Sequence, residues 1–151
     1  MAKVSPDSEI LEYAISREVE AYYFFLALAE RVKTPEMRKI FEDLAEEELE
    51  HKAKLELEIM KTGGTVPADV EPAQPEGFQD IFGGTTELDI DYKGMLQLGM
   101  EKEETSFRTY VNLLTNVADQ ESREVLLALA EEEVKHKLRF EQEYEALLKR
   151  Q

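Results

Sequence analysis

The sequence of 151 residues predicts an all-α protein: a four-helix bundle made of two repeated helical hairpins joined by a long crossover connection. Three observations lead to this expectation. Apolar residues recur at alternating spacings of three and four in four long stretches. One segment rich in Pro and Gly interrupts the pattern, and the second half of the chain repeats the first. The length suits a single domain over residues 1–151, with a core of its own.

Start signals support the individual helices. Ser5 and Pro6 are a capping residue followed by proline at the first helical position. Thr34 and Pro35 give the second helix the same start, and Asp119 is a candidate N-cap for the fourth. We therefore expect helices at about 6–33, 35–61, 91–117 and 119–149.

Residues 62–90 do not carry the helical pattern. They contain Pro67, Pro72 and Pro75 as well as two Gly-Gly pairs. A loop of this length is unusual in a compact domain, but a bundle with one crossover needs a connection that runs its full length. A helix of about 27 residues spans roughly 40 Å, which about a dozen extended residues can cover. The segment is therefore predicted to be the crossover.

An internal repeat supports the paired hairpins. A shift of 85 residues places 14–56 on 99–141 without a gap. The most similar blocks are 44–52 and 129–137, which both begin with Leu-Ala-Glu-Glu-Glu and end with His-Lys. Two similar hairpins are expected to face each other, whereas a solenoid would need at least three units.

Composition excludes several functions. The chain has 34 acidic and 18 basic residues and a formal net charge of −16, so neither nucleic acid nor an anionic membrane surface is an expected partner. It has no Cys, which excludes disulfides and thiolate metal sites. No signal-peptide core follows Met1, and the longest apolar run, 21–29, is too short to span a bilayer. The expected compartment is the cytoplasm.

The two histidines of the chain carry the main functional signal. His51 and His136 are repeat partners, and each has a Glu three residues earlier, Glu48 and Glu133. Positions i and i+3 share one face of a helix, so a carboxylate and an imidazole can bind one ion together. Both pairs lie on the apolar stripe that should face the core.

Two further glutamates, Glu18 and Glu103, interrupt the apolar stripes of the first and third helices at a matching height. Four carboxylates in a dry core need compensating charge, and two divalent cations supply it. Oxygen and imidazole ligands suit iron or manganese, and zinc could bind by affinity. The candidate metal ligands are Glu18, Glu48, His51, Glu103, Glu133 and His136.

Simpler interpretations apply to the neighbouring residues. The bundle could instead hold solvated or salt-bridged Glu and His side chains. Tyr22 and Tyr110 lie one and two turns after Glu18 and Glu103; each could hydrogen-bond a ligand carboxylate or simply pack in the core. The remaining glutamates near the motifs are expected on solvated faces: Glu46, Glu47, Glu101, Glu104, Glu131 and Glu132.

These motifs resemble the rubrerythrin branch of the ferritin-like superfamily. The resemblance covers all four helices and rests on Glu18-x-x-Ala21 with Phe25, Glu48-x-x-His51, Glu103 with Tyr110, and Glu133-x-x-His136. It implies a ferritin-like four-helix bundle with a non-haem di-iron site. In such a site Glu18 and Glu103 would be terminal ligands, Glu48 and Glu133 bridges, and His51 and His136 one ligand on each iron. It also implies reaction with hydrogen peroxide or oxygen.

The sequence departs from the family in two respects. Typical rubrerythrins carry a rubredoxin module with four Cys, and these 151 residues contain none, so electrons would come from a separate donor protein. They also have a further carboxylate ligand one turn after the third-helix Glu, where this chain has Ser106. The site is therefore expected to be more symmetric than in the typical enzymes.

The expected function is reduction of hydrogen peroxide, or oxygen, at two iron ions. One alternative is ferroxidase or iron-handling activity as in ferritins, and another is a structural or regulatory bundle whose site is vestigial or binds zinc. Helix 6–33 is apolar almost all round near Tyr23, Phe24 and Ala27. An exposed apolar patch there would mark an interface, so a homodimer or higher homo-oligomer is expected.

Overall fold

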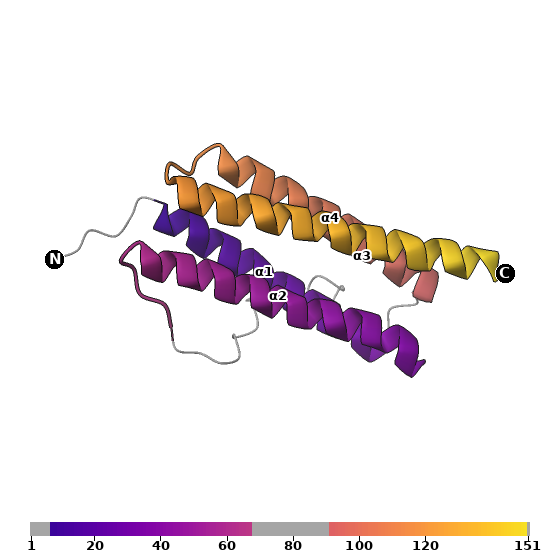
Figure 1. Cartoon of the computed structure of the whole chain (residues 1–151). Helices are drawn as coiled ribbons and strands as arrows, with labels where there is room; N and C mark the ends of the chain where they lie inside the picture. Colours follow the sequence, from indigo (N-terminus) through magenta and orange to yellow (C-terminus); the bar gives the residue numbers. More distant parts are fainter. Residues whose placement is uncertain (1–6, 68–90, 151) are drawn as a thin grey trace.

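The computed structural model describes residues 7–67 and 91–150, which form a bundle of long helices (Figure 1). The predicted start at Ser5 and Pro6 lies outside these residues. Within them the helix bounds agree with the expected ones to within a few residues. The helices are α1 (Ser8–Arg31), α2 (Pro35–Lys61), α3 (Tyr92–Leu114) and α4 (Gln120–Lys149).

The four helices form two antiparallel hairpins. α1 packs against α2 and α3 against α4, while α1 also contacts α3 and α2 contacts α4. α2 ends at one end of the bundle and α3 begins at the other (Figure 1). This is the arrangement that a crossover connection produces. Of the expected crossover 62–90, residues 68–90 lie outside the described part of the chain.

The helix starts differ in how they are capped. The Asp119 carboxylate accepts a hydrogen bond from the backbone N–H of Ser122 at 2.9 Å, which confirms the predicted cap. Asp91 does the same for the backbone N–H of Gly94 at 2.8 Å, a cap that the sequence analysis missed. Thr34 occupies the N-cap position of α2, but its side chain makes no capping bond. There the proline at the first helical position defines the start.

The internal repeat extends to the turns between helices. The guanidinium of Arg38 donates to the backbone oxygen of Val32 at 2.9 and 3.2 Å. Its repeat partner Arg123 donates to the backbone oxygen of Val117 at 3.1 Å, and also to that of Leu114. Both turns thus have carbonyls that an arginine from the following helix satisfies, which fixes the two hairpins in the same geometry.

Two apolar clusters fill the bundle on either side of a central polar layer. In the first, the centroid of the Phe140 ring lies 5.8 Å from the ring centroids of both Phe25 and Phe41, and all three residues are fully buried. Gly99 permits this packing, because a Cβ there would lie 2.6 Å from the Phe140 ring. Burial of each such side chain contributes about 1.5–3 kcal/mol. The second cluster includes Leu11, Leu55, Tyr110, Leu126 and Leu129.

The expectation of an exposed patch on α1 is wrong. Phe24 is only 7% exposed, and Tyr23 and Ala27 are half-buried and pack against the first cluster. The reason is that α1 contacts both α2 and α3, so more than one of its faces is covered. The expected homo-oligomer therefore stays a prediction without this premise. None of the described helices is long and apolar enough to cross a membrane.

Candidate metal centre

The six predicted ligands meet in the polar layer at the middle of the bundle. Every helix contributes, and none of the six side chains belongs to a residue more than 5% exposed. α1 and α3 supply one carboxylate each, and α2 and α4 supply a Glu-x-x-His pair each. In chain order the residues are Glu18, Glu48, His51, Glu103, Glu133 and His136.

These side chains form two overlapping clusters. In each cluster the candidate ligand atoms lie within 4.8 Å of one another. Both clusters contain Glu48 and Glu133, while each has its own histidine and its own further glutamate. The arrangement therefore offers two adjacent cation positions with two carboxylates between them. The clusters are Glu18, Glu48, His51, Glu133 and Glu48, Glu103, Glu133, His136.

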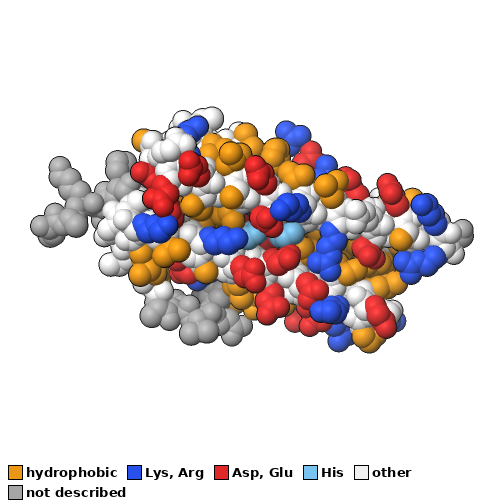
Figure 2. Space-filling model, viewed as in Figure 1, with side chains coloured by type: hydrophobic (Ala, Val, Ile, Leu, Met, Phe, Trp, Pro, Cys, Tyr) orange, Lys and Arg blue, Asp and Glu red, His pale blue; other side chains and the backbone are white. Residues whose placement is uncertain are grey.

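His51 presents its Nδ1 atom to three carboxylates. That atom lies 3.0 Å from Oε1 of Glu133, 3.5 Å from Oε2 of Glu18 and 3.7 Å from Oε2 of Glu48. The His51 ring is almost parallel to the His136 ring, with 5.5 Å between the ring centroids. The two imidazoles thus approach the centre from the same side, where α2 and α4 face each other. Histidine atoms are visible in that region, among acidic and basic side chains, in Figure 2.

His136 is held on both sides of its ring. Its Nδ1 atom lies 3.4 Å from Oε1 of Glu48 and 3.5 Å from Oε2 of Glu103. Its Nε2 atom lies 2.8 Å from Oε2 of Glu47 on α2. The expectation that Glu47 belongs to a purely solvated face is therefore wrong, because α2 and α4 lie close enough for it to reach across. A carboxylate at the outer nitrogen orients a metal-binding imidazole.

Whether cations fit this centre follows from the hydrogen bonding of the inward-facing ligand atoms. Within the described residues, these atoms have no hydrogen-bond partner: both carboxylate oxygens of Glu48, Glu103 and Glu133, one oxygen of Glu18, and Nδ1 of His51 and His136. Buried polar atoms of this kind are costly without a partner. Two divalent cations would satisfy all of them and balance four carboxylates. Hard oxygen and imidazole donors suit iron or manganese, and they also accept zinc.

Without cations, the pKa values of several side chains in this layer differ from their ordinary values. Burial raises the pKa of Glu48 and of Glu103 well above the ordinary value, and neighbouring carboxylates raise both further. Burial alone would lower the pKa of His51, but contacts with Glu133, Glu18 and Glu48 raise it to about 12. Burial lowers the pKa of His136. The cation-free centre therefore keeps protons where metal ligands need none.

Tyr110 is one of the two tyrosines considered beside the ligands. Its phenol, on α3, donates a hydrogen bond to Oε1 of Glu18 on α1, so the hydrogen-bonding alternative is the correct one for Tyr110. The half-buried Tyr22 packs edge-on against Tyr23, with 5.0 Å between ring centroids, and lies against the first apolar cluster. Phe25 takes the place of Tyr110 in the other half of the repeat and has no hydroxyl to offer Glu103.

The other glutamates near the motifs mostly face outward as expected. Glu46, Glu101 and Glu131 are exposed. Glu104 pairs with Arg108 at 2.9 Å. Glu132 pairs with Lys135 at 3.2 Å, but one of its carboxylate oxygens also lies within 4.8 Å of ring nitrogens of His51 and His136, so the expectation of a purely solvated face is wrong for Glu132. Ser106 is half-buried on α3.

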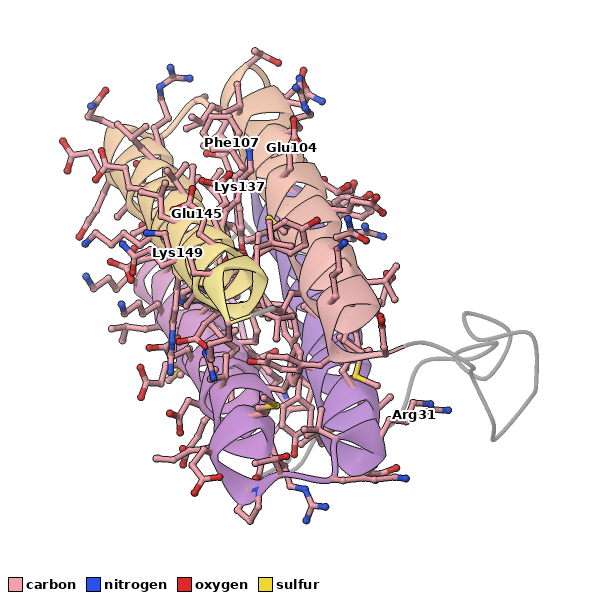
Figure 3. The ribbon with its side chains drawn as sticks, turned by 90° about the vertical axis from the view of Figure 1, so that its right-hand side faces the viewer. Arg31, Glu104, Phe107, Lys137, Glu145 and Lys149 are labelled. Carbon is pink, nitrogen blue, oxygen red and sulfur yellow. The ribbon has the colours of Figure 1, made fainter. Side chains whose placement is uncertain are left out.

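A cavity of about 240 Å³ opens between α3 and α4 and reaches the centre, which the sequence analysis did not foresee. Glu103 and Glu133 lie on its lining although they are 1% and 0% exposed, so the inner end of the cavity reaches two candidate ligands. Figure 3 shows Glu104 and Phe107 on α3 and Lys137 on α4 where these two helices face each other. No periodic pattern marks such an opening, because it depends on how side chains of two helices pack.

Comparison with known proteins agrees with this geometry. The sequence model named Rubrerythrin matches residues 9–144, which include all six candidate ligands. A similar solved structure is an open pore ferritin from the hyperthermophilic archaeon Archaeoglobus fulgidus. The two share 19% sequence identity and a TM-score of 0.74, over 97% of this chain and 87% of that chain. This likeness establishes the fold as a ferritin-like four-helix bundle.

No curated protein matches the sequence. Since the family match spans nearly the whole chain, the protein belongs to the rubrerythrin family.

Proposed function

We propose that the protein is a non-haem di-iron oxidoreductase that reduces hydrogen peroxide, or oxygen, with electrons from a separate donor protein. The observation that supports this most is the pair of clusters sharing Glu48 and Glu133. Two iron ions, when bound, supply the two electrons that peroxide reduction needs. With two protons, one hydrogen peroxide becomes two water molecules, and the donor protein restores the electrons.

The candidate ligands would hold two iron ions in the following way. One iron would be held by a terminal glutamate and a histidine of the first hairpin, and the other by the equivalent pair of the second. Two shared carboxylates would hold both ions together. Tyr110 would fix the orientation of Glu18 through its hydrogen bond. The ligand pairs are Glu18 with His51 and Glu103 with His136, and the shared residues are Glu48 and Glu133.

Iron oxidation and handling is the second candidate function. It is favoured by Ser106, which stands where typical rubrerythrins have a further carboxylate, and by the ferritin among similar structures. A ferritin-like role requires a hollow shell of many subunits and uptake of more than two irons per chain. Size-exclusion chromatography with iron analysis separates the two functions. A bundle that binds zinc in a structural or regulatory role would instead show zinc and no redox reaction.

The proposed function is tested by aerobic iron loading followed by metal analysis and visible spectroscopy. We expect two irons per chain and a visible absorption that the metal-free protein lacks. The reduced protein is then mixed with hydrogen peroxide or oxygen in a stopped-flow instrument, and peroxide is expected to oxidise it faster. Glu103→Ala should lose this reaction. Glu101→Ala, an exposed residue on the same helix, is the matched control. A protein that binds no iron pair contradicts the proposal.

A further inference from the structure

The two halves of the centre are unlike in how their terminal carboxylates are held. Glu18 accepts a hydrogen bond from Tyr110. Among the described residues, neither oxygen of Glu103 has a hydrogen-bond partner, although Glu103 is only 1% exposed. Phe25, the repeat partner of Tyr110, supplies no donor. The carboxylate of Glu103 therefore lacks the phenol contact that Glu18 has, and Nδ1 of His136 lies 3.5 Å from its Oε2.

The cavity between α3 and α4 opens on this same half. Its lining includes the carboxylates of Glu103 and Glu133, which are 1% and 0% exposed. Two buried acidic groups thus border the cavity that opens between α3 and α4. In the first hairpin, the repeat positions of Phe107 and Arg108 are taken by two tyrosines packed edge-on, Tyr22 and Tyr23. The opening follows from the second hairpin's own side chains.

Three side chains on the cavity lining are apolar. Phe107 is half-buried, and Val134 and Leu138 are 37% and 49% exposed along one face of α4. A water molecule takes up about 30 Å³ in the liquid, so hydrogen peroxide uses only a small part of 240 Å³. The remaining space, with three apolar side chains around it, suits a small hydrocarbon group.

The charges on the cavity lining offset one another. The Glu104 carboxylate lies 2.9 Å from the Arg108 guanidinium and 3.9 Å from Nζ of Lys137. Nζ of Lys137 also lies 3.7 Å from Oε1 of Glu141. Two acidic and two basic groups leave no surplus cation to attract an anionic ligand. The cavity therefore favours an uncharged molecule.

We propose that this cavity receives uncharged alkyl hydroperoxides as substrates. The hydroperoxide group points to Glu103 and Glu133, and the alkyl group packs on Phe107, Val134 and Leu138. This inference rests on the proposed peroxide reduction. The O–O bond breaks, two electrons come from the reduced donor protein by way of the iron pair, and two protons are taken up. One alkyl hydroperoxide gives one alcohol and one water.

Binding is tested without any redox reaction. The full chain, metal-free and methyl-labelled, is titrated with tert-butanol, the product expected from tert-butyl hydroperoxide. We expect saturable shifts of the Val134 and Leu138 methyl resonances and no shift for Leu127, an exposed residue of α4 that does not line the cavity. Val134→Phe should abolish the shifts, and Leu127→Phe should keep them. Absence of saturable shifts in the wild type overturns the proposal.

Substrate choice is tested on the iron-loaded protein. The ratio of the rate constants for tert-butyl hydroperoxide and hydrogen peroxide should fall by at least about tenfold in Val134→Phe. In Leu127→Phe both rate constants should remain as in the wild type. An unchanged ratio in Val134→Phe contradicts the inference. If neither peroxide reacts, the proposed function fails, while the methyl titration still decides whether the cavity binds the alkyl group.

Discussion

Tyr110 on α3 donates a hydrogen bond to Glu18 on α1, and so joins the second hairpin to a candidate ligand of the first. The contact occurs once in the described part of the centre, because the repeat has Phe25 at the position equivalent to Tyr110. A sequence with two repeated halves therefore folds into a site with two different halves. Glu18 is held in one orientation, and Glu103 borders a cavity.

Tyr110→Phe should weaken metal binding at the Glu18 position. The variant keeps the ring in the second apolar cluster and removes only the hydroxyl, so the fold should remain. Loss of such an outer contact typically costs about 10- to 100-fold in metal affinity. Anaerobic Fe(II) titration should show one weakened and one unchanged step. Tyr144→Phe, whose hydroxyl accepts from Gln97 on the surface, is the control. Equal weakening of both steps would contradict the assignment of Tyr110 to one half.

Glu48→Ala and Glu133→Ala should each abolish binding of a metal pair. Both residues belong to both clusters, so either substitution removes a ligand from each cation position. We expect at most one metal per chain, measured by elemental analysis after gel filtration. Glu46→Ala, on the exposed face of the same helix as Glu48, should keep two. Two metals per chain in both Glu48→Ala and Glu133→Ala would show that these carboxylates are not shared.

Glu47→Gln should affect the half of the centre that contains His136. The Glu47 carboxylate lies 2.8 Å from Nε2 of His136, on the side away from the candidate cations. Replacing it removes the negative charge that makes the imidazole a stronger donor. We expect weaker binding of one metal by about tenfold and a changed visible spectrum of the ferric protein. The exposed Glu131→Gln should leave both unchanged.

The metal-free protein should lose stability as the pH rises from 7 to 9. The pKa of His51 is about 12 in the folded state and 6.5 as the ordinary value. The stabilising contribution is complete below pH 6.5 and is lost progressively towards pH 12, because the folded state binds the extra proton. The slope for one such group is at most about 1.4 kcal/mol per pH unit. The raised pKa values of Glu48 and Glu103 act in the same direction.

Urea unfolding in the presence of a chelator measures this slope, and His51→Gln should reduce it. With metal bound the trend should reverse towards higher pH, since deprotonated ligands bind cations more tightly. A metal-free protein whose free energy of unfolding is constant between pH 7 and 9 would contradict the charged state of His51.

The sequence alone determined the helices and the set of residues that meet at the centre. Helical periodicity and caps such as Pro35 and Asp119 are local signals, so they locate helix ends without knowledge of the partners. The spacing of Glu48 and His51 places both on one face of any helix. The repeat then gives the second pair at the same height, which is why the buried layer could be foreseen.

Only the tertiary structure decided which residues belong to both candidate cation positions and from which side a small molecule can reach them. The approach of α3 to α4, which Gly99 permits beside Phe140, depends on packing between distant parts of the chain. The same packing determines that Glu47 reaches His136 and that Tyr110 reaches Glu18. Distances between helices and their rotations follow from how side chains interlock, and a periodic pattern within one helix does not contain that information.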